Sequence, residues 1–88
     1  MKTKWHPRAQ ASYRQVARYI NTKFGRKARQ DFILKVKDME RQLKQSPNIG
    51  QIDPLYADRA KTYRSVIING LNKMVYYIDS NTIWIAGF

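Results

Sequence analysis

Residues 62–88, TYRSVIINGLNKMVYYIDSNTIWIAGF, decide the fold because three short apolar runs follow one another there with turn residues between them. The runs cover 63–68, 73–79 and 82–88 and are rich in Val, Ile, Tyr and Trp, which favour strands. Asn69-Gly70 and Ser80-Asn81 separate the runs and are typical of two-residue hairpin loops. The stretch therefore predicts a three-stranded antiparallel meander.

The two loops also predict which residues face each other. The second loop places Ile78 opposite Ile83, and the first places Arg64 opposite Val75. Because side chains alternate along a strand, the sheet then has two faces. The predicted core face carries Tyr63, Ile67, Met74, Tyr76, Ile78, Ile83 and Ile85. The predicted open face interleaves cations with aromatic rings and carries Arg64, Val66, Lys73, Val75, Tyr77, Trp84 and Phe88.

A short strand at 2–5 and two helices are predicted before the meander. Residues 8–24 and 27–45 have apolar residues at steps of three and four; Gly25 ends the first helix and Ser46-Pro47 ends the second. The two apolar stripes are Ala9, Tyr13, Val16, Ile20 and Phe24, then Ala28, Phe32, Val36, Met39 and Leu43. This order predicts an α+β fold in which a helical hairpin packs on the core face of a sheet formed by the short strand and the meander.

Length and charge limit the function. The chain has 88 residues, which make one domain over 1–88. Its 17 Lys and Arg against 6 Asp and Glu give a net charge of +11, which favours polyanionic partners. No apolar run approaches the roughly 20 residues of a membrane span, and the amino terminus lacks a signal peptide, so we expect a cytoplasmic protein without a membrane partner.

The sequence contains few groups suited to catalysis. It has no cysteine and one histidine, and it lacks a glycine-rich phosphate loop, a nucleophile elbow and a plausible pair of catalytic carboxylates. We therefore expect no metal and no cofactor. His6 and the acids Asp53 and Asp58 of the predicted loop at 48–61 are interpreted as structural or solvated residues.

What remains is the predicted open face, where Arg64 and Lys73 lie beside Tyr77 and Trp84. Arginine and lysine suit phosphate contacts, and tyrosine and tryptophan stack on bases. The alternative is a face that is merely solvated or covered by another segment.

Several segments together resemble one protein family. They are YINTKFG at 19–25, A-x-x-x-F at 28–32, LKQSPNIG at 43–50, YRS at 63–65, KMVYYID at 73–79 and TIWIAGF at 82–88. In this order the chain is similar to the RelE/ParE superfamily of bacterial type II toxins, also called plasmid stabilisation proteins. The resemblance implies a β-α-α-β-β-β fold and a growth-inhibiting toxin that is neutralised by an acidic antitoxin protein.

The resemblance leaves the mechanism open. RelE-like members are mRNA interferases, which cleave messenger RNA on the ribosome without a metal, and by strand position their basic catalytic residues correspond to Arg64 and Lys73. This ribosome-dependent cleavage is the first hypothesis. Val66 replaces a lysine common in such enzymes, and the chain stops at Phe88, where the family usually continues with an arginine-containing tail.

Two alternatives follow from these departures. ParE-like members poison DNA gyrase by binding it, and the long helical hairpin and the YRS segment are more similar to them. A truncated toxin that only binds its antitoxin is the other alternative. In each case we expect the RNA or the protein partner to contact Arg14, Arg18, Lys61, Tyr77 and Trp84.

Overall fold

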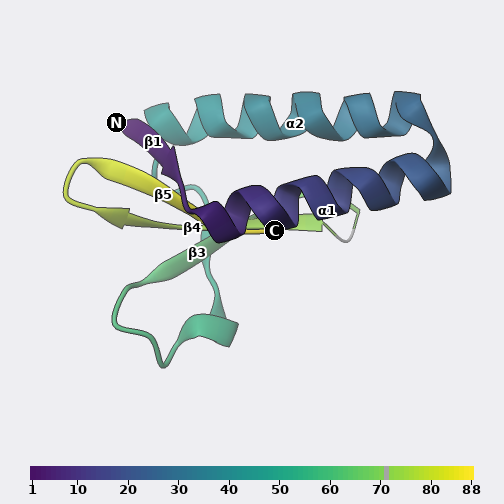
Figure 1. The fold of residues 1–88 in the computed structure, drawn as a ribbon. Helices are drawn as coiled ribbons and strands as arrows, with labels where there is room; N and C mark the ends of the chain where they lie inside the picture. The colour runs from purple at the N-terminus through teal and green to yellow at the C-terminus, as the bar shows by residue number, and fades with distance from the viewer. Residues whose placement is uncertain (71) are drawn as a thin grey trace.

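The computed structural model, which describes residues 1–70 and 72–88, is a five-stranded sheet with two helices on one face (Figure 1). In chain order the elements are β1 (Lys2–Trp5), α1 (Pro7–Phe24), α2 (Arg26–Gln45), β2 (Gln51–Ile52), the 3-10 helix η1 (Pro54–Tyr56), β3 (Tyr63–Asn69), β4 (Asn72–Asp79) and β5 (Thr82–Gly87). The strand order is β1-β5-β4-β3-β2, with β1 parallel to β5 and the other pairs antiparallel. The predicted α+β fold, with a short strand and a helical hairpin before a three-stranded meander, is confirmed.

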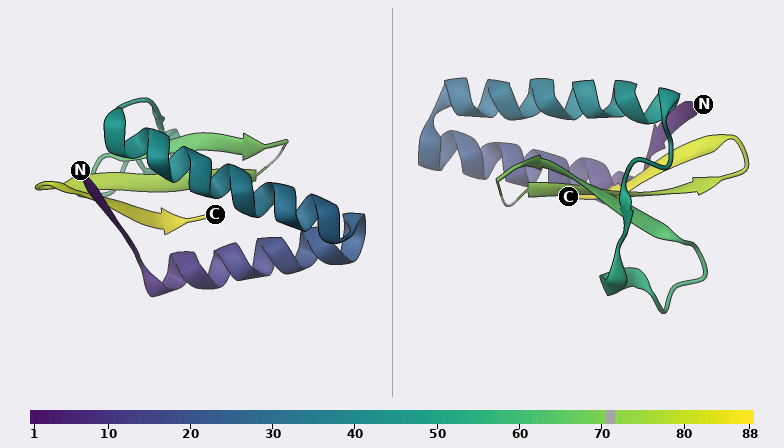
Figure 2. Two further views of the ribbon diagram at one scale, coloured as in Figure 1. Left: turned by 90° about the horizontal axis from the view of Figure 1, so that it is seen from above. Right: turned by 180° about the vertical axis from the view of Figure 1, so that it is seen from behind.

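The two helices form a tight antiparallel hairpin (Figure 2). Pro7 begins α1, where its missing N–H removes no helical hydrogen bond. Gly25 ends it with a φ of 98°, a left-handed conformation that favours glycine, and donates its N–H to the carbonyl of Asn21. Since α2 begins at the next residue, the helices turn back on each other without a loop.

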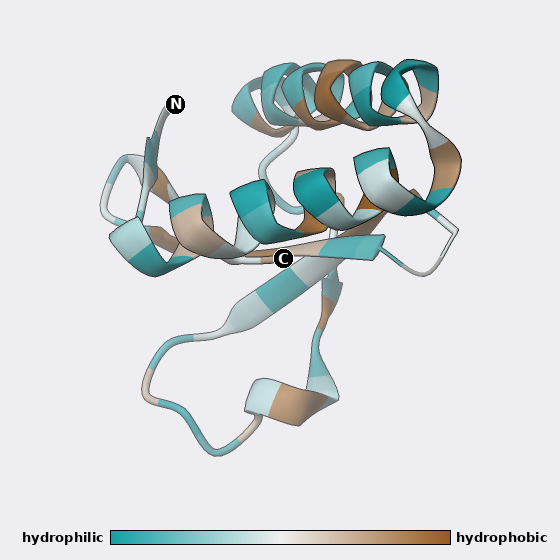
Figure 3. Cartoon of the chain, turned by 45° about the vertical axis from the view of Figure 1, so that its right-hand side comes forward, coloured by the Kyte–Doolittle hydropathy of each residue, from teal (hydrophilic) through white to brown (hydrophobic). Residues whose placement is uncertain are grey.

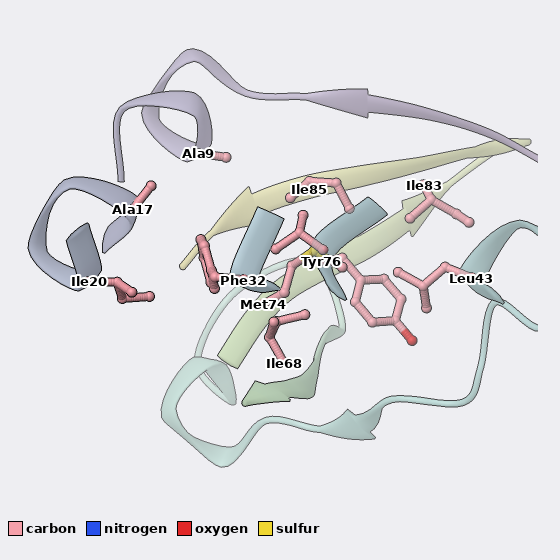
Figure 4. Packing of buried hydrophobic residues seen from close by; sticks show 11 residues of the cluster. Ala9, Ala17, Ile20, Phe32, Leu43, Ile68, Met74, Tyr76, Ile83 and Ile85 are labelled. Atoms are coloured by element: carbon pink, nitrogen blue, oxygen red, sulfur yellow. The ribbon is translucent and has the colours of Figure 1, made fainter. Parts of the chain in front are cut away.

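Both helices direct their apolar stripes toward the sheet, and their polar sides face outward (Figure 3). The buried hydrophobic cluster draws on both helices and on all three meander strands (Figure 4). Its members are Ala9, Ala17, Ile20, Phe32, Val36, Leu43, Ile68, Met74, Tyr76, Ile83 and Ile85. One stripe residue differs from the prediction: Phe24 is 67% exposed, because the hairpin tip extends beyond the end of the sheet (Figure 1).

The register of the first hairpin was predicted wrongly by one residue. The structure pairs Tyr63 with Tyr77, Arg64 with Tyr76 and Val66 with Met74. The cause is that β3 continues through Asn69 and its pairing shifts between Ile67 and Asn69. A shift of one residue moves every side chain to the other face, so Tyr63 and Ile67 lie on the open face while Arg64 and Val66 turn toward the helices.

The second hairpin has the predicted register, with Tyr77 opposite Trp84 and Ile78 opposite Ile83. Ser80, in its loop, has the positive φ, here 56°, that such tight turns require. The register shifts near the end of β5, because Tyr76 pairs with Ile85 but Val75 pairs with Gly87.

Because of this bulge, Phe88 lies on the helix side of the sheet and not on the open face, where it was predicted. Its ring stacks on Trp5 at 5.3 Å between centroids and lies 5.4 Å from the ring of Tyr13. Its N–H donates to the hydroxyl of Ser12 at 3.1 Å. An extra residue in one strand changes which face the following side chain occupies.

The segment predicted as a loop at 48–61 contains β2 and η1, which the sequence did not reveal because so few residues pair. It is fixed to the core by Tyr76, whose buried hydroxyl donates to the carbonyl of Pro47 at 2.7 Å and accepts from the N–H of Gly50 at 3.0 Å. Gly50 has no room for a side chain, since a Cβ there would lie 2.7 Å from the Tyr76 hydroxyl oxygen and 3.0 Å from the carbonyl oxygen of Ser65.

We therefore expect Gly50→Ala to lower the free energy of unfolding by about 1–3 kcal/mol, because the methyl group forces a buried tyrosine and a strand backbone apart. Gly87→Ala is the control, since nothing lies within 4 Å of a Cβ at that position. Urea denaturation of both variants measures the difference. Equal midpoints for the two variants would show that the loop relaxes without loss.

Candidate functional site

One row of side chains crosses the open face of the sheet from β1 to β3. The pairing places Lys4 opposite Trp84, Trp84 opposite Tyr77, and Tyr77 opposite Tyr63. We call these four residues the cross-strand row. The Nζ of Lys4 lies 5.6 Å from the Trp84 ring centroid, and the rings of Tyr63 and Tyr77 are 5.1 Å apart edge to face.

His6 covers the middle of this row. The backbone N–H of His6 donates to the carbonyl of Ile85 at 3.0 Å, and this hydrogen bond extends the pairing of β1 by one residue. The imidazole lies 4.9 Å from the Trp84 ring centroid, and its Nε2 shares a hydrogen bond of 2.9 Å with the hydroxyl of Tyr77. Burial raises the pKa of Tyr77, so its hydroxyl stays protonated at neutral pH. The contacts of His6 agree with its structural interpretation.

The row continues into the loop before β3. Tyr56 stacks on Tyr63 at 4.8 Å, and the guanidinium carbon of Arg59 lies 5.3 Å from the centroid of the Tyr56 ring. Lys61 lies 5.7 Å from the centroid of the Tyr77 ring and donates to Asp79 at 2.8 Å. That hydrogen bond raises the pKa of Lys61. Lys61, Tyr77 and Trp84, predicted as contact residues, thus lie on one surface.

Lys73 lies on the open face, as predicted, but it is not free. Its Nζ donates to Asp53 Oδ2 at 2.7 Å, and Asp53 is only 3% exposed. The other carboxylate oxygen of Asp53 accepts from the N–H of Leu55 at 3.0 Å and caps η1. The hydrogen bond from Lys73 is the main reason that the pKa of Asp53 falls below its ordinary value of 3.8. This pair ties the 48–61 segment to β4.

Arg64 occupies the opposite face from the one predicted. It pairs with the buried Tyr76, is half-buried, and donates from Nη1 to the carbonyl of Gly50 at 2.8 Å. The one-residue shift in register is the reason. The two residues predicted to be catalytic, Arg64 and Lys73, therefore project from opposite faces of the sheet.

A hollow of about 290 Å³ lies beside the cross-strand row. Cations from three parts of the chain line it, namely Arg8 at the start of α1, Arg59 before β3, and Lys73 on β4. Tyr56 and Tyr63 form part of its wall. Arg8 and Arg59 were not singled out from the sequence, because only the pairing of distant strands brings their segments together.

Arg14 and Arg18, which were also predicted to contact a partner, lie elsewhere. They line a second hollow of about 240 Å³ between α1 and α2, together with Arg29. The predicted contact residues therefore divide between two surfaces, the open face of the sheet and the groove of the helical hairpin. Helical spacing alone relates Arg14 to Arg18, but Arg29 joins them only because α2 folds back on α1.

Within residues 1–70 and 72–88, no three side chains of His, Asp or Glu gather in a way that would hold a metal ion. Neither α1 nor α2 is long and apolar enough to cross a membrane.

Over residues 3–87 the sequence matches the ParE toxin of the type II toxin-antitoxin system, parDE. Because this match spans nearly the whole chain, the protein belongs to the ParE toxin family, which confirms the predicted RelE/ParE relationship. No curated protein sequence matches the chain significantly.

Two solved structures share the fold. A chain from the chromosomal ParDE toxin-antitoxin system of P. aeruginosa superposes with a TM-score of 0.76 at 16% identity, covering 99% of this chain and 91% of that one. The YoeB dimer of Staphylococcus aureus gives a TM-score of 0.67 at 21% identity, with coverages of 99% and 92%. At these identities the likeness concerns the fold.

The geometry of the Lys73–Asp53 pair predicts that Lys73→Met lowers the free energy of unfolding by roughly 1–3 kcal/mol at pH 7, because it removes the charged donor of a buried carboxylate. The folded pKa of Asp53 lies below 3.8, so the pair stabilises the protein fully above that pH and loses its effect as the pH falls through the folded pKa. The difference between wild type and variant should shrink accordingly below pH 4.

Denaturant titrations at pH 7 and pH 3 measure this difference. Lys61→Met is the control, because the Lys61–Asp79 pair has similar geometry but both side chains are nearly half exposed, and we expect little change. A Lys61→Met variant as unstable as Lys73→Met would contradict the role of burial.

Proposed function

We propose that the protein is a toxin that arrests growth by binding the DNA gyrase of its host, and that it does not cleave RNA. The observation that carries this proposal is the placement of Arg64 and Lys73. They project from opposite faces, and each is engaged within the fold, Arg64 by the carbonyl of Gly50 and Lys73 by Asp53.

Ribosome-dependent mRNA cleavage, the first hypothesis from the sequence, requires cations that converge on one phosphate. A cation neutralised by a carboxylate at 2.7 Å has little charge left to offer a transition state. The ParE family membership adds support, since gyrase poisoning is the activity that the resemblance attaches to ParE-like members.

The cross-strand row suits protein recognition better than base stacking. Tyr77 is 9% exposed, and its hydroxyl and ring are already in contact with His6 and Tyr63. Stacking on a nucleobase requires a free ring face. The row instead begins with Lys4 beside the half-buried Trp84 and ends with Arg59 over the ring of Tyr56, and this mixture of aromatic and cationic groups is enriched in protein interfaces.

We therefore expect the purified protein to inhibit supercoiling of relaxed plasmid by the host's gyrase while leaving messenger RNA intact on programmed ribosomes. Lys4→Glu with Arg59→Glu should weaken inhibition at least tenfold, because both cations lie on the open face and their reversal opposes an acidic target surface. Lys37→Glu with Lys44→Glu, which makes the same change of charge on α2, should have a smaller effect.

RNA cleavage without gyrase inhibition would overturn the proposal in favour of the RelE-like mechanism. A protein that binds an antitoxin but affects neither gyrase nor RNA would overturn both mechanisms. Cleavage of the messenger RNA and supercoiling of the plasmid are measured on separate gels, so the two mechanisms give distinct results.

The same proposal includes an acidic antitoxin. The protein has 17 basic and 6 acidic residues, so its positive net charge attracts an acidic partner over a long distance. We infer that an acidic amphipathic segment of the antitoxin covers the open face of the sheet, including Trp84 or Tyr77, which lie on the side away from the helical hairpin.

The association rate of toxin and antitoxin should fall at least tenfold when salt rises from about 0.05 to 0.5 M, because ions screen long-range attraction. Stopped-flow quenching of tryptophan fluorescence measures this rate, and Trp84→Phe identifies the signal of that ring. A rate that does not change with salt would remove the electrostatic account.

A further inference from the structure

The groove between α1 and α2 gathers three arginines from two helices. Arg14 and Arg18 lie one turn apart on α1, and Arg29 reaches the same hollow from the first turn of α2. Tyr13, Asn21 and the buried Ala17 complete the lining on α1. The three arginines therefore line one hollow of about 240 Å³.

These arginines oppose the local stability of the helices. Like charges four residues apart repel, and α1 contains no acidic residue to offset them. Arg26, Lys27 and Arg29 occupy the first turn of α2, where the helix dipole disfavours cations and where no acidic residue is present. Local rules broken together at one place are expected where a binding function compensates.

The acids of the protein are engaged elsewhere. Five ion pairs occur in the part of the chain that the structure describes, and none includes Arg14, Arg18 or Arg29. Glu40 of α2 accepts hydrogen bonds from Thr3 and Trp5 of β1. The groove therefore presents positive charge to solvent.

We propose that this groove binds the phosphodiester backbone of double-stranded DNA. All three cations are arginines, whose planar guanidinium groups bind phosphate oxygens in pairs, as a lysine cannot. The side chains of Arg14 and Arg18 emerge about 5–6 Å apart on the helix, so they reach successive anionic groups. Contacts of this kind position a protein on a duplex without reading its sequence.

The lining favours a duplex over a single strand. Single-stranded nucleic acid is held by aromatic rings that stack on its bases. Tyr13 is the aromatic residue of this groove, and its ring already packs against Trp5, Phe32 and Phe88 at 5.2–5.7 Å. A backbone without accessible bases fits such a surface.

The lining also favours DNA over an acidic amphipathic peptide. Such a peptide needs an exposed apolar strip on which to pack. In the groove Ala17 is buried and Tyr13 and Ile33 are half-buried, whereas the exposed Phe24 and Leu34 line a different hollow. This DNA binding is separate from the proposed binding of gyrase and requires no protein other than the toxin.

Fluorescence anisotropy with a labelled duplex of 20 base pairs and mixed sequence tests this proposal on the isolated protein, without gyrase. In R14Q/R18Q/R29Q we expect binding at about 50 mM salt to weaken at least tenfold. The slope of log K against log salt should fall by about 2.7, because each lost phosphate contact contributes about 0.9.

The matched control is K2Q/K4Q/R59Q, which also removes three positive charges, but from residues away from the groove. It should reduce the slope of log K against log salt by less than one. R14K/R18K/R29K keeps the charge and loses the paired geometry, so we expect the wild-type slope with weaker binding. Circular dichroism checks that each variant is folded, which is expected because all these side chains are exposed.

Equal losses in the groove variant and the control would show that binding follows net charge alone, and would overturn the proposal. Tighter binding of a 20-nucleotide single-stranded RNA than of the duplex would assign the groove to RNA. If the groove variant loses binding to poly-L-glutamate but not to the duplex, the groove binds acidic protein. Because gyrase is absent, none of these outcomes depends on the proposed target.

Discussion

The register between β3 and β4 determines which charges the two faces of this protein carry. It is set by one irregularity between Ile67 and Asn69, because of which residues 63–67 of β3 each pair one position away from their partners in an unbroken hairpin. That shift turns the half-buried Arg64 toward the helix side and brings Tyr63 beside Tyr77 on the open side. The open face is consequently aromatic, with its cations at the rim.

The sequence was informative where local chemistry specifies local geometry. Ser80 and Gly25 adopt the positive φ values that end a strand and a helix, so the second hairpin and the helical hairpin were predicted correctly. It was less informative where one inserted residue changes a face, as for Tyr63 and Phe88. The contact of Gly50 with Tyr76 links residues 26 positions apart, and no periodic pattern encodes it. Hence the fold was largely predictable, whereas the composition of the open face was not.

The six acidic residues of the protein act mainly in its architecture. Asp53 secures the long segment before β3, Glu40 joins α2 to β1, and Asp79 holds Lys61 near the second turn. Asp31 and Asp38 pair with neighbours on α2. Part of the excess of basic residues gathers on two separate surfaces, around Arg8, Arg59 and Lys73 beside the open face and around Arg14, Arg18 and Arg29 on the helical hairpin.

The parallel pairing of β1 with β5 joins the first strand of the chain to the last. During synthesis β1 emerges first and cannot pair until β5 has left the ribosome. The ring of Trp5 likewise cannot stack on Phe88 before that residue has emerged. Closing so long a loop is entropically costly and delays the final sheet. A nascent chain of this topology therefore cannot complete its sheet before β5 has been made, because the β1 pairing and the Trp5–Phe88 contact both depend on it.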